Sequence, residues 1–245
     1  MAENRDIRPS LERLGKRFGL SSPQLEQLEH VVGVLALDEL APTTVTEPEL
    51  AVDVHLADSL VALDLEQLGR AQRLADIGAG AGFPGIPLAV ALPHCEVRLV
   101  ESQARKCAFI ERVAAAASVR NAEAVCARVE DWPEGIGAHD VVSARAVGAQ
   151  PVVLEYAAPL LRLGGIVVDW RGKRDPEEES LACEAAELLG LRRDWIGRVE
   201  PYEGVRDHHL HVFSKVRETP GRFPRRAGMA SKKPLVVTSP DRNRR

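Results

Sequence analysis

A glycine-rich run directly after a short apolar stretch is the part of the sequence with the clearest chemical meaning. The run reads Asp-Ile-Gly-Ala-Gly-Ala-Gly-Phe-Pro-Gly over residues 76–85, between a predicted strand and a predicted helix. In an open α/β sheet, such a turn lies at the carboxyl end of a strand, where ligands bind, and its glycines let the backbone approach the ligand closely. Gly78 and Gly80 are therefore candidate ligand-binding residues.

The spacing of the run argues against the common phosphate-binding turns. A dinucleotide fingerprint reads Gly-x-Gly-x-x-Gly, whereas Phe83 stands here where the third glycine is expected. The Gly-Lys-Ser/Thr of a phosphate loop is missing, and residues 78–87 contain no basic side chain. Asp76, just before the turn, disfavours a phosphate. The turn therefore predicts a cationic or hydroxyl-rich ligand.

Polar side chains also follow the next three predicted strands. Glu101 ends the second strand, where a carboxylate can accept hydrogen bonds from both hydroxyls of a ribose. The stretch Arg-Val-Glu-Asp at 128–131 follows the third strand and can frame the edge of an adenine with side chain and backbone, and Arg145 follows the fourth strand. Each residue alone is equally well explained by a structural role, but together they lie at four successive strand ends and favour one site.

This combination indicates the cofactor S-adenosylmethionine. Its adenosine ribose fits a strand-end carboxylate, its sulfonium is cationic, and it carries no phosphate. The predicted reaction class is therefore methyl transfer. The candidate cofactor-binding residues from this argument are Asp76, Gly78, Gly80, Glu101, Val129, Glu130 and Arg145.

The elements that must position these residues alternate between strand and helix after residue 73. Strands are expected at 74–77, 97–100, 122–126, 140–143, 166–170, 192–199 and 209–215, and helices at 84–92, 104–117, 151–161 and 177–189. Such alternation predicts an α/β fold, a mostly parallel seven-stranded Rossmann-like sheet whose last two strands form an antiparallel edge hairpin. Residues 1–70 are expected to form an N-terminal helical extension, 71–217 the methyltransferase core and 218–245 a basic tail.

The charge of the chain is distributed unevenly. Residues 215–245 contain ten Lys and Arg against two acids, whereas the first 214 residues hold 22 bases and 34 acids. A basic tail on an acidic body indicates contact with a polyanion, the alternative being a solvated terminus. The four cysteines form no Cys-x-x-Cys pair, and neither a signal peptide nor a membrane span is predicted. A cytoplasmic protein is therefore expected.

Several motifs spread over residues 10–236 carry a family resemblance. The most specific are Gly-Phe-Pro-Gly-Ile-Pro at 82–87, Arg-Phe-Pro-Arg-Arg-Ala-Gly at 222–228 and Lys-Lys-Pro-Leu at 232–235. His-Leu-Ala-Asp-Ser-Leu at 55–60 and Ser-Ala-Arg-Ala at 143–146 add to them. On these motifs the sequence resembles the RsmG (GidB) family, the bacterial small-subunit ribosomal RNA guanine-N7 methyltransferases.

The resemblance implies a class I S-adenosylmethionine-dependent methyltransferase and assigns roles to single residues. Gly78 and Phe83 would lie along the cofactor, Glu101 would hold the ribose, and Val129 and Glu130 would frame the adenine. Arg145 would close the site near the transferred methyl group. The implied partner is 16S ribosomal RNA or the 30S subunit, with no stable protein partner, and a monomer is expected.

Guanine N7 is an exposed lone-pair acceptor, so it can attack a sulfonium methyl without first losing a proton. Catalysis then requires alignment rather than a base or a covalent cysteine. Arg145 is accordingly expected to be catalytic by orienting cofactor or RNA. The candidate RNA-binding residues are Arg222, Arg225, Arg226, Lys232 and Lys233.

Other interpretations remain open without the resemblance. The protein could methylate another RNA base or a small molecule, or it could be a non-catalytic RNA-binding module. No metal site is expected at His209 and His211, which fit an ordinary edge strand. His55, Asp58 and Ser59 match a hydrolase triad by type, but their close spacing on one helix favours a capping or inter-helix hydrogen-bonding role.

Overall fold

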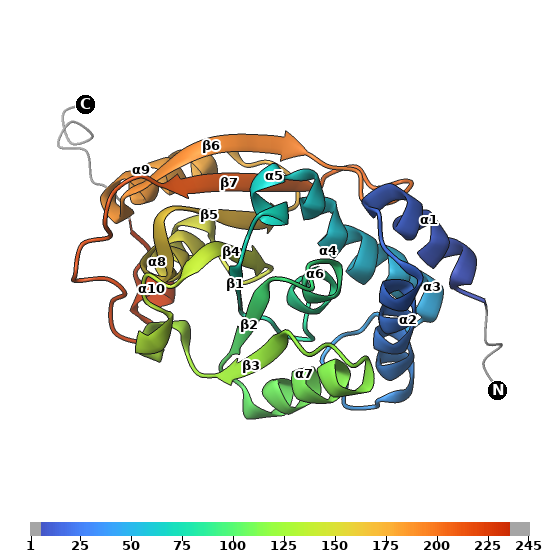
Figure 1. The fold of residues 1–245 in the computed structure, drawn as a ribbon. Helices are drawn as coiled ribbons and strands as arrows, with labels where there is room; N and C mark the ends of the chain where they lie inside the picture. Colours follow the sequence, from blue (N-terminus) through green and yellow to red (C-terminus); the bar gives the residue numbers. More distant parts are fainter. Residues whose placement is uncertain (1–5, 236–245) are drawn as a thin grey trace.

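The computed structural model describes residues 6–235, and its centre is a seven-stranded sheet between two helical layers (Figure 1). The strands are β1 (Arg73–Ile77), β2 (Glu96–Glu101), β3 (Ala122–Cys126), β4 (His139–Arg145), β5 (Leu161–Arg171), β6 (Leu191–Arg198) and β7 (His209–Lys215). The longer helices are α1 (Arg8–Phe18), α2 (Ser22–Leu37), α6 (Gly85–Ala91), α7 (Ala104–Ala116), α8 (Gln150–Leu160) and α9 (Pro176–Leu189). The short ones are α3 (Pro48–Ala51), η1 (Val52–Ala57), α4 (Asp58–Leu60), η2 (Val61–Asp64), α5 (Glu66–Gly69), η3 (Val129–Asp131), η4 (Pro133–Gly135) and α10 (Met229–Lys232).

The sheet confirms the predicted fold class. Its strand order is β3-β2-β1-β4-β5-β7-β6, and the strands β1 to β5 are parallel to one another. The strand β7 pairs antiparallel with both β5 and β6, so the predicted antiparallel hairpin is present at the sheet edge. The carboxyl ends of β1, β2 and β4 therefore meet at one edge of the sheet.

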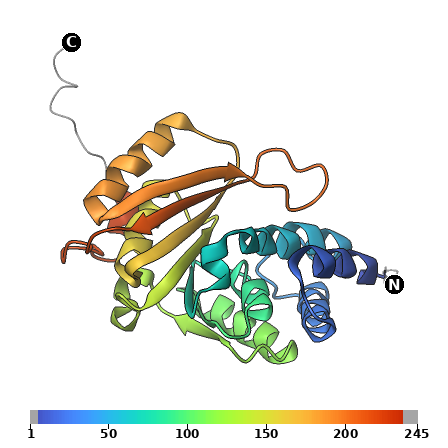
Figure 2. The same ribbon diagram turned by 45° about the horizontal axis from the view of Figure 1, so that its top comes forward.

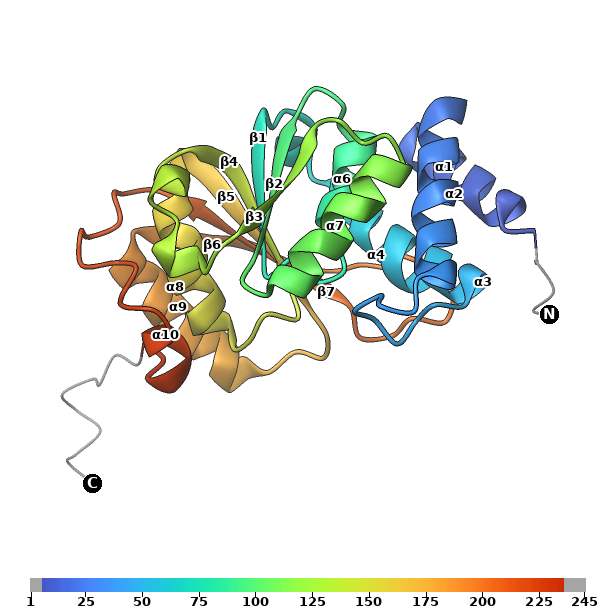
Figure 3. The same cartoon turned by 90° about the horizontal axis from the view of Figure 1, so that it is seen from below.

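Helices cover both faces of the sheet (Figure 3). One face carries α6, α7 and the N-terminal helices, and the other carries α8, α9 and α10. Side chains of β1 alternate between two hydrophobic clusters, since Leu74 belongs to the first and Ala75 and Ile77 belong to the second. Among residues 6–235 no helix is long and apolar enough to cross a membrane.

The N-terminal helices are built into the first of these clusters. Four apolar residues recur at helical spacing along α2, and all four are buried: Leu28, Val31, Val32 and Leu35. Residues 48–64 form one helical stretch whose middle turn, η1, is a π-helix. This wider turn was not predicted from the sequence, and such turns are frequent at functional sites. The division of the chain at residues 70 and 217 stays a prediction.

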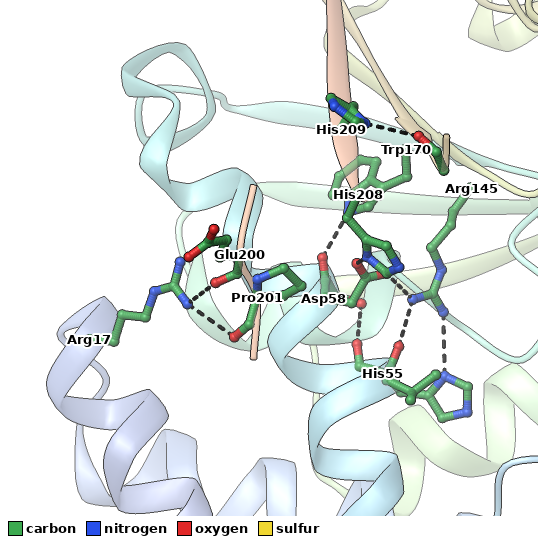
Figure 4. A network of polar contacts seen from close by, with 12 residues as sticks. Arg17, His55, Asp58, Arg145, Trp170, Glu200, Pro201, His208 and His209 are labelled. Carbon is green, nitrogen blue, oxygen red and sulfur yellow. Dashed lines mark hydrogen bonds and ion pairs between the residues drawn. The ribbon is translucent and has the colours of Figure 1, made fainter. Parts of the chain in front are cut away.

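A ten-residue loop between β6 and β7 reaches over the N-terminal helices (Figure 2). The Arg17 guanidinium on α1 donates hydrogen bonds to the carbonyl oxygens of Glu200 and Pro201 in this loop, at 2.9 and 3.0 Å (Figure 4). The loop ends at His208, whose position therefore depends on α1 as well as on β7.

The described part of the predicted basic tail, residues 218–235, follows β7 and packs on the protein. It contains the short helix α10, and Phe223 and Ala230 are buried. Residues 236–245, the rest of the predicted basic tail, lie outside the described residues.

Candidate active site

The glycine turn after β1 has the backbone conformation that its sequence indicates. Gly78, Gly80 and Gly82 have positive φ values of 64°, 58° and 94°, which residues with side chains rarely adopt. A Cβ on Gly78 would lie 2.9 Å from Val147 Cγ2, just after β4. The turn thus needs glycine both for its conformation and for its contact with the end of the fourth strand.

Asp76 supports this turn from beneath, with its carboxylate turned into the protein interior. Its side chain is fully buried, and its Oδ2 accepts a hydrogen bond from the backbone N–H of Gly85 at 2.9 Å. Its Oδ1 accepts another from the Ser143 hydroxyl at 2.8 Å. Burial raises the pKa of Asp76 to about 7. This corrects the expectation that Asp76 meets the cofactor, because the carboxylate instead ties the turn and α6 to β4.

Glu101 lies at the end of β2, directly beside the turn. Its Oε2 accepts a hydrogen bond from Gly80 N at 3.1 Å, and its Oε1 accepts one from Gln103 N at 2.9 Å. The Lys106 ammonium on α7 lies 4.0 Å from Oε2. Glu101 is 6% exposed, and these donors fix the orientation of its carboxylate at the edge where the turn opens.

Val129 and Glu130 form part of η3, after β3, and both are half-buried. The Glu130 carboxylate accepts a hydrogen bond from the backbone N–H of Gly228 at 2.8 Å. The predicted adenine loop is therefore in contact with the C-terminal segment, a relationship that the sequence did not indicate.

Arg145 ends β4, and it is held by the helical stretch 48–64 (Figure 4). Its Nη1 donates to Asp58 Oδ2 at 2.7 Å and to the carbonyl oxygen of Val54 at 3.1 Å. Asp58 is buried, and its Oδ1 lies 3.0 Å from His208 Nδ1. One carboxylate thus joins an arginine from the parallel sheet to a histidine at the start of β7.

His55 and Phe83 form the wall next to Arg145. Their rings stack at 4.5 Å with an interplanar angle of 8°, and the Arg145 guanidinium lies 5.7 Å from the Phe83 ring centre. His55 Nε2 lies 3.2 Å from the carbonyl oxygen of Val45, which assigns the proton to Nε2 and leaves Nδ1 as an acceptor toward Arg145. Burial, together with the positive charge of Arg145, lowers the pKa of His55 to about 4. The imidazole is therefore neutral at pH 7.

Residues 55–59 make hydrogen bonds, but not the capping or inter-helix ones that were expected, and their place beside Arg145 was missed. Ser59 Oγ donates to the carbonyl oxygen of His55 within the helix, while Asp58 bonds across to the sheet. The His-x-x-Asp spacing was visible in the sequence. The pairing of Asp58 with Arg145, which lies 87 positions later, was not visible in the sequence.

A cavity of about 650 Å³ opens beside Arg145, at the carboxyl ends of β4 and β5. It is lined by Val54, His55, Asp58, Arg145, Ala146, Trp170, Arg171, Gly172, Lys173, Tyr202, His208 and His209. Ala146, directly after Arg145, has a left-handed φ of 57°, a conformation that is uncommon for alanine and concentrates at functional sites. Several cationic or imidazole side chains besides Arg145 make this cavity suitable for an electron-rich ligand.

The five predicted RNA-binding side chains do not share one environment. Arg222, Arg226, Lys232 and Lys233 are exposed. Arg225 instead pairs with the buried Glu155 on α8, at 2.6 and 2.5 Å. Its guanidinium is occupied within the protein, which corrects its expected role as a free phosphate contact. Within residues 6–235 no group of three or more His, Cys, Asp and Glu is placed to hold a metal ion.

Similar folds occur in solved structures of low sequence identity. The [4+2]-cyclase SpnF superimposes with a TM-score of 0.57 at 16% identity, over 80% of this chain and 97% of that one. Aeropyrum pernix fibrillarin, solved with natively bound S-adenosylmethionine, gives a TM-score of 0.51 at 17% identity, over 64% of this chain and 72% of that one. These likenesses support the fold.

The sheet order and the turn after β1 are those of the class I S-adenosylmethionine-dependent methyltransferase fold. The family model of rRNA small subunit methyltransferase G matches residues 26–199. The ribosomal RNA small subunit methyltransferase G of Desulfitobacterium hafniense (strain Y51) is 36% identical over 241 residues, covering 96% of this chain and all of that protein. The chain belongs to the rRNA small subunit methyltransferase G family, and it is a methyltransferase enzyme.

Proposed function

We propose that the protein transfers the methyl group of S-adenosylmethionine to N7 of a guanine in 16S ribosomal RNA. The observation that carries this proposal is the cavity beside Arg145, which adjoins the glycine turn through Phe83. Cavities of roughly 300–1,000 Å³ hold small ligands, so a single flipped-out base fits the space available. The cofactor would lie along Gly78, Gly80 and Phe83, with Glu101 at its ribose and Val129 and Glu130 at its adenine.

The chemistry requires no proton transfer before attack. The N7 lone pair forms the new N–C bond, the electrons of the C–S bond remain on sulfur, and the positive charge moves from the sulfonium to the purine. His55 fits this scheme, because its Nε2–H is held by Val45 and its Nδ1 faces a cation. It orients Arg145 and Phe83 rather than serving as a base.

A covalent route through cysteine is disfavoured by the environment of the thiols. The residues that line the cavity beside Arg145 include no cysteine. Burial raises the pKa of both Cys95 and Cys107 to about 12, so neither forms a thiolate at neutral pH. Direct attack by N7 is therefore the reaction that the side chains support best.

Arg145 is proposed as the catalytic residue by orientation. Its side chain is fixed by Val54 and Asp58 and lies over the edge of the Phe83 wall. Because alignment of N7, methyl carbon and sulfur replaces a bimolecular encounter, a fixed guanidinium can contribute without exchanging a proton. The RNA backbone would be held by Arg222, Arg226, Lys232 and Lys233.

The substrate form, the cytoplasmic location and the monomeric state belong to the same proposal. Ribosomal RNA is named as the substrate of the relatives, and the 30S subunit is the particle that presents it in folded form. A monomer suffices, because all of the candidate cofactor and cavity residues come from one chain.

The test is methyl transfer from tritiated S-adenosylmethionine to 30S subunits, naked 16S RNA and a metabolite extract, followed by nucleoside analysis. The expected product is 7-methylguanosine from ribosomal RNA. Label in another nucleoside or in a metabolite would establish one of the alternative methyltransferase substrates. RNA binding without any label would identify a non-catalytic RNA-binding module and overturn the proposal.

A further inference from the structure

The C-terminal segment, residues 218–235, is docked on the protein by apolar contacts. Phe223 is 8% exposed and Ala230 is 1% exposed, and Phe223 joins the hydrophobic cluster of α8 and α9. Leu235 packs against the same cluster, which also receives Val129 from the predicted adenine loop. The segment and that loop thus share one apolar layer.

A buried ion pair fixes the segment more firmly than apolar contact alone. Glu155 on α8 is 1% exposed, and the Arg225 guanidinium meets both of its oxygens through Nε and Nη2. The Arg225 Nη2 also donates to the carbonyl oxygen of Lys233 at 2.8 Å, which closes the segment on itself. Because a buried carboxylate is costly without its partner, Arg225 cannot leave α8 freely.

Two further polar contacts hold the segment, and one of them reaches the predicted cofactor loop. The Gly228 N–H donates to Glu130 Oε1 at 2.8 Å, and Gly228 has a φ of 76°, which favours glycine at this position. Tyr156, next to Glu155 on α8, places its hydroxyl 3.1 Å from Ser231 Oγ. The carboxylate of Glu130 is therefore oriented by the backbone of the C-terminal segment.

We propose that residues 218–235 form a wall of the cofactor site, in which Arg225 and Gly228 are positioning residues for Glu130. Binding of RNA phosphates to the exposed Lys and Arg side chains of this wall then strengthens S-adenosylmethionine binding, and cofactor binding strengthens RNA binding. The inference rests on the proposed function, in which Glu130 frames the adenine and the segment contacts RNA.

The physical basis is the cost of ordering a short loop. The helical turn η3 spans three residues, so it is not held by regular secondary structure of its own. A loop that is already ordered loses less conformational entropy when the cofactor binds. Coupling between two binding sites is reciprocal. If RNA orders the wall and raises the affinity for the cofactor, the cofactor must therefore raise the affinity for RNA by the same factor.

The decisive experiment compares Arg225→Met with Arg226→Met, its exposed neighbour. Cofactor affinity is measured by calorimetry with S-adenosylmethionine alone, and release of the segment is followed by trypsin cleavage after Arg222 and Lys232, two exposed sites that every variant keeps. Arg225→Met should speed cleavage and weaken cofactor binding about tenfold, within the usual range of coupling between sites. Arg226→Met should leave cofactor binding unchanged while weakening RNA binding.

The double variant Arg225→Met/Glu155→Met separates anchoring from an unpaired buried charge. If it still releases the segment and still binds the cofactor weakly, the wall is supported. Wild-type cofactor affinity in a double variant whose segment is cleaved would overturn the proposal. The proposal would also be overturned if the wild-type protein bound the cofactor with the same affinity with and without saturating small-subunit RNA. Cofactor binding needs no methyl transfer, so a failure of the proposed reaction would appear separately, in the wild-type transfer assay.

Discussion

Asp58 Oδ2 and Arg145 Nη1 lie 2.7 Å apart and join the helical stretch 48–64 to the end of β4. Asp58 also contacts His208, so three parts of the chain meet at one carboxylate. The guanidinium that we place in catalysis is thus oriented by the N-terminal helices rather than by the parallel sheet alone.

Replacing Arg145 tests this arrangement. Arg145→Ala leaves the Asp58 carboxylate buried with His208 as its remaining side-chain partner, and should lower the free energy of unfolding by about 3 kcal/mol, the low end for a broken buried pair. It should also reduce the methyl-transfer rate by about 100-fold, because misplacement of the reacting groups is costly. Urea unfolding and single-turnover transfer measure the two effects. Unchanged turnover in Arg145→Ala would remove the residue from the mechanism.

Glu101 should control cofactor affinity. Glu101→Gln removes the charge that accepts hydrogen bonds from Gly80 N and Gln103 N and that we assign to the ribose hydroxyls. Hydrogen bonds to charged groups contribute about 1.5–3 kcal/mol, so the cofactor Kd should rise roughly 10- to 100-fold in calorimetry. Glu123→Gln on β3, an exposed carboxylate paired with Arg98, is the matched control and should bind the cofactor as the wild type does.

The buried carboxyl of Asp76 should give stability a distinctive pH dependence. Burial raises its pKa from 3.8 to about 7, so between these values the folded protein binds more protons than the unfolded chain. Its contribution to stability is therefore present at low pH and is lost as the pH rises toward 7. Asp169, whose pKa burial also raises to about 7, contributes in the same direction.

Two histidines oppose this trend, because burial lowers the pKa of His55 and of His211 to about 4. The informative quantity is thus the difference between variant and wild type. The free energy of unfolding of Asp76→Asn, relative to wild type, should rise between about pH 4.5 and 7, where the wild type loses the Asp76 contribution. A difference that is flat across this range would show that Asp76 titrates normally.

Gly85 should not tolerate a side chain, although its φ is ordinary. A Cβ there would lie 2.8 Å from both Asp76 Oδ2 and Leu99 Cδ2. Gly85→Ala should cost about 1–3 kcal/mol, as overpacking does, and weaken cofactor binding by shifting the turn. Gly33→Ala, in α2 with nothing within 4 Å, should instead stabilise the protein by about 0.5–1 kcal/mol. Thermal unfolding of the two variants checks these opposite signs.

The exposed Lys and Arg side chains of the C-terminal segment should set the salt dependence of RNA binding. Alanine at Arg222, Arg226, Lys232 or Lys233 should reduce the slope of log K against log salt by about 0.7–0.9 for each phosphate that is no longer neutralised. The cofactor Kd without RNA should not change, since these side chains are exposed and Glu130 is held by the Gly228 backbone. Filter binding across a salt series measures the slope. A wild-type slope in the fourfold variant would place the RNA elsewhere.

The sheet and the turn were predicted correctly because a short apolar run and a glycine each favour a strand or a turn at their own position in the chain. The helices of the N-terminal region and the strand that precedes Gly78 are such cases. The role of Asp76 was not predictable, because the sequence shows a carboxylate before the turn but not its burial beneath it. Likewise, the basic composition around Arg225 suggested phosphate contact, while its buried partner lies 70 residues earlier.

The relationships that complete the candidate site are all of this long-range kind. Arg145 with Asp58 and Glu130 with Gly228 join residues from different layers, and neither pair shares a motif. The π-helical turn that carries His55 also gave no signal, since helical periodicity does not distinguish it from an α-helix.

The shared core of the first helical layer and the sheet has a practical consequence for engineering. A truncated protein that starts at β1 would not be a minimal catalyst, because the truncation removes Asp58 and His55 and exposes the apolar surface of α6 and α7. Attempts to graft this enzyme's specificity onto another methyltransferase would have to transplant the helical stretch 48–64 and the loop before β7 along with the sheet.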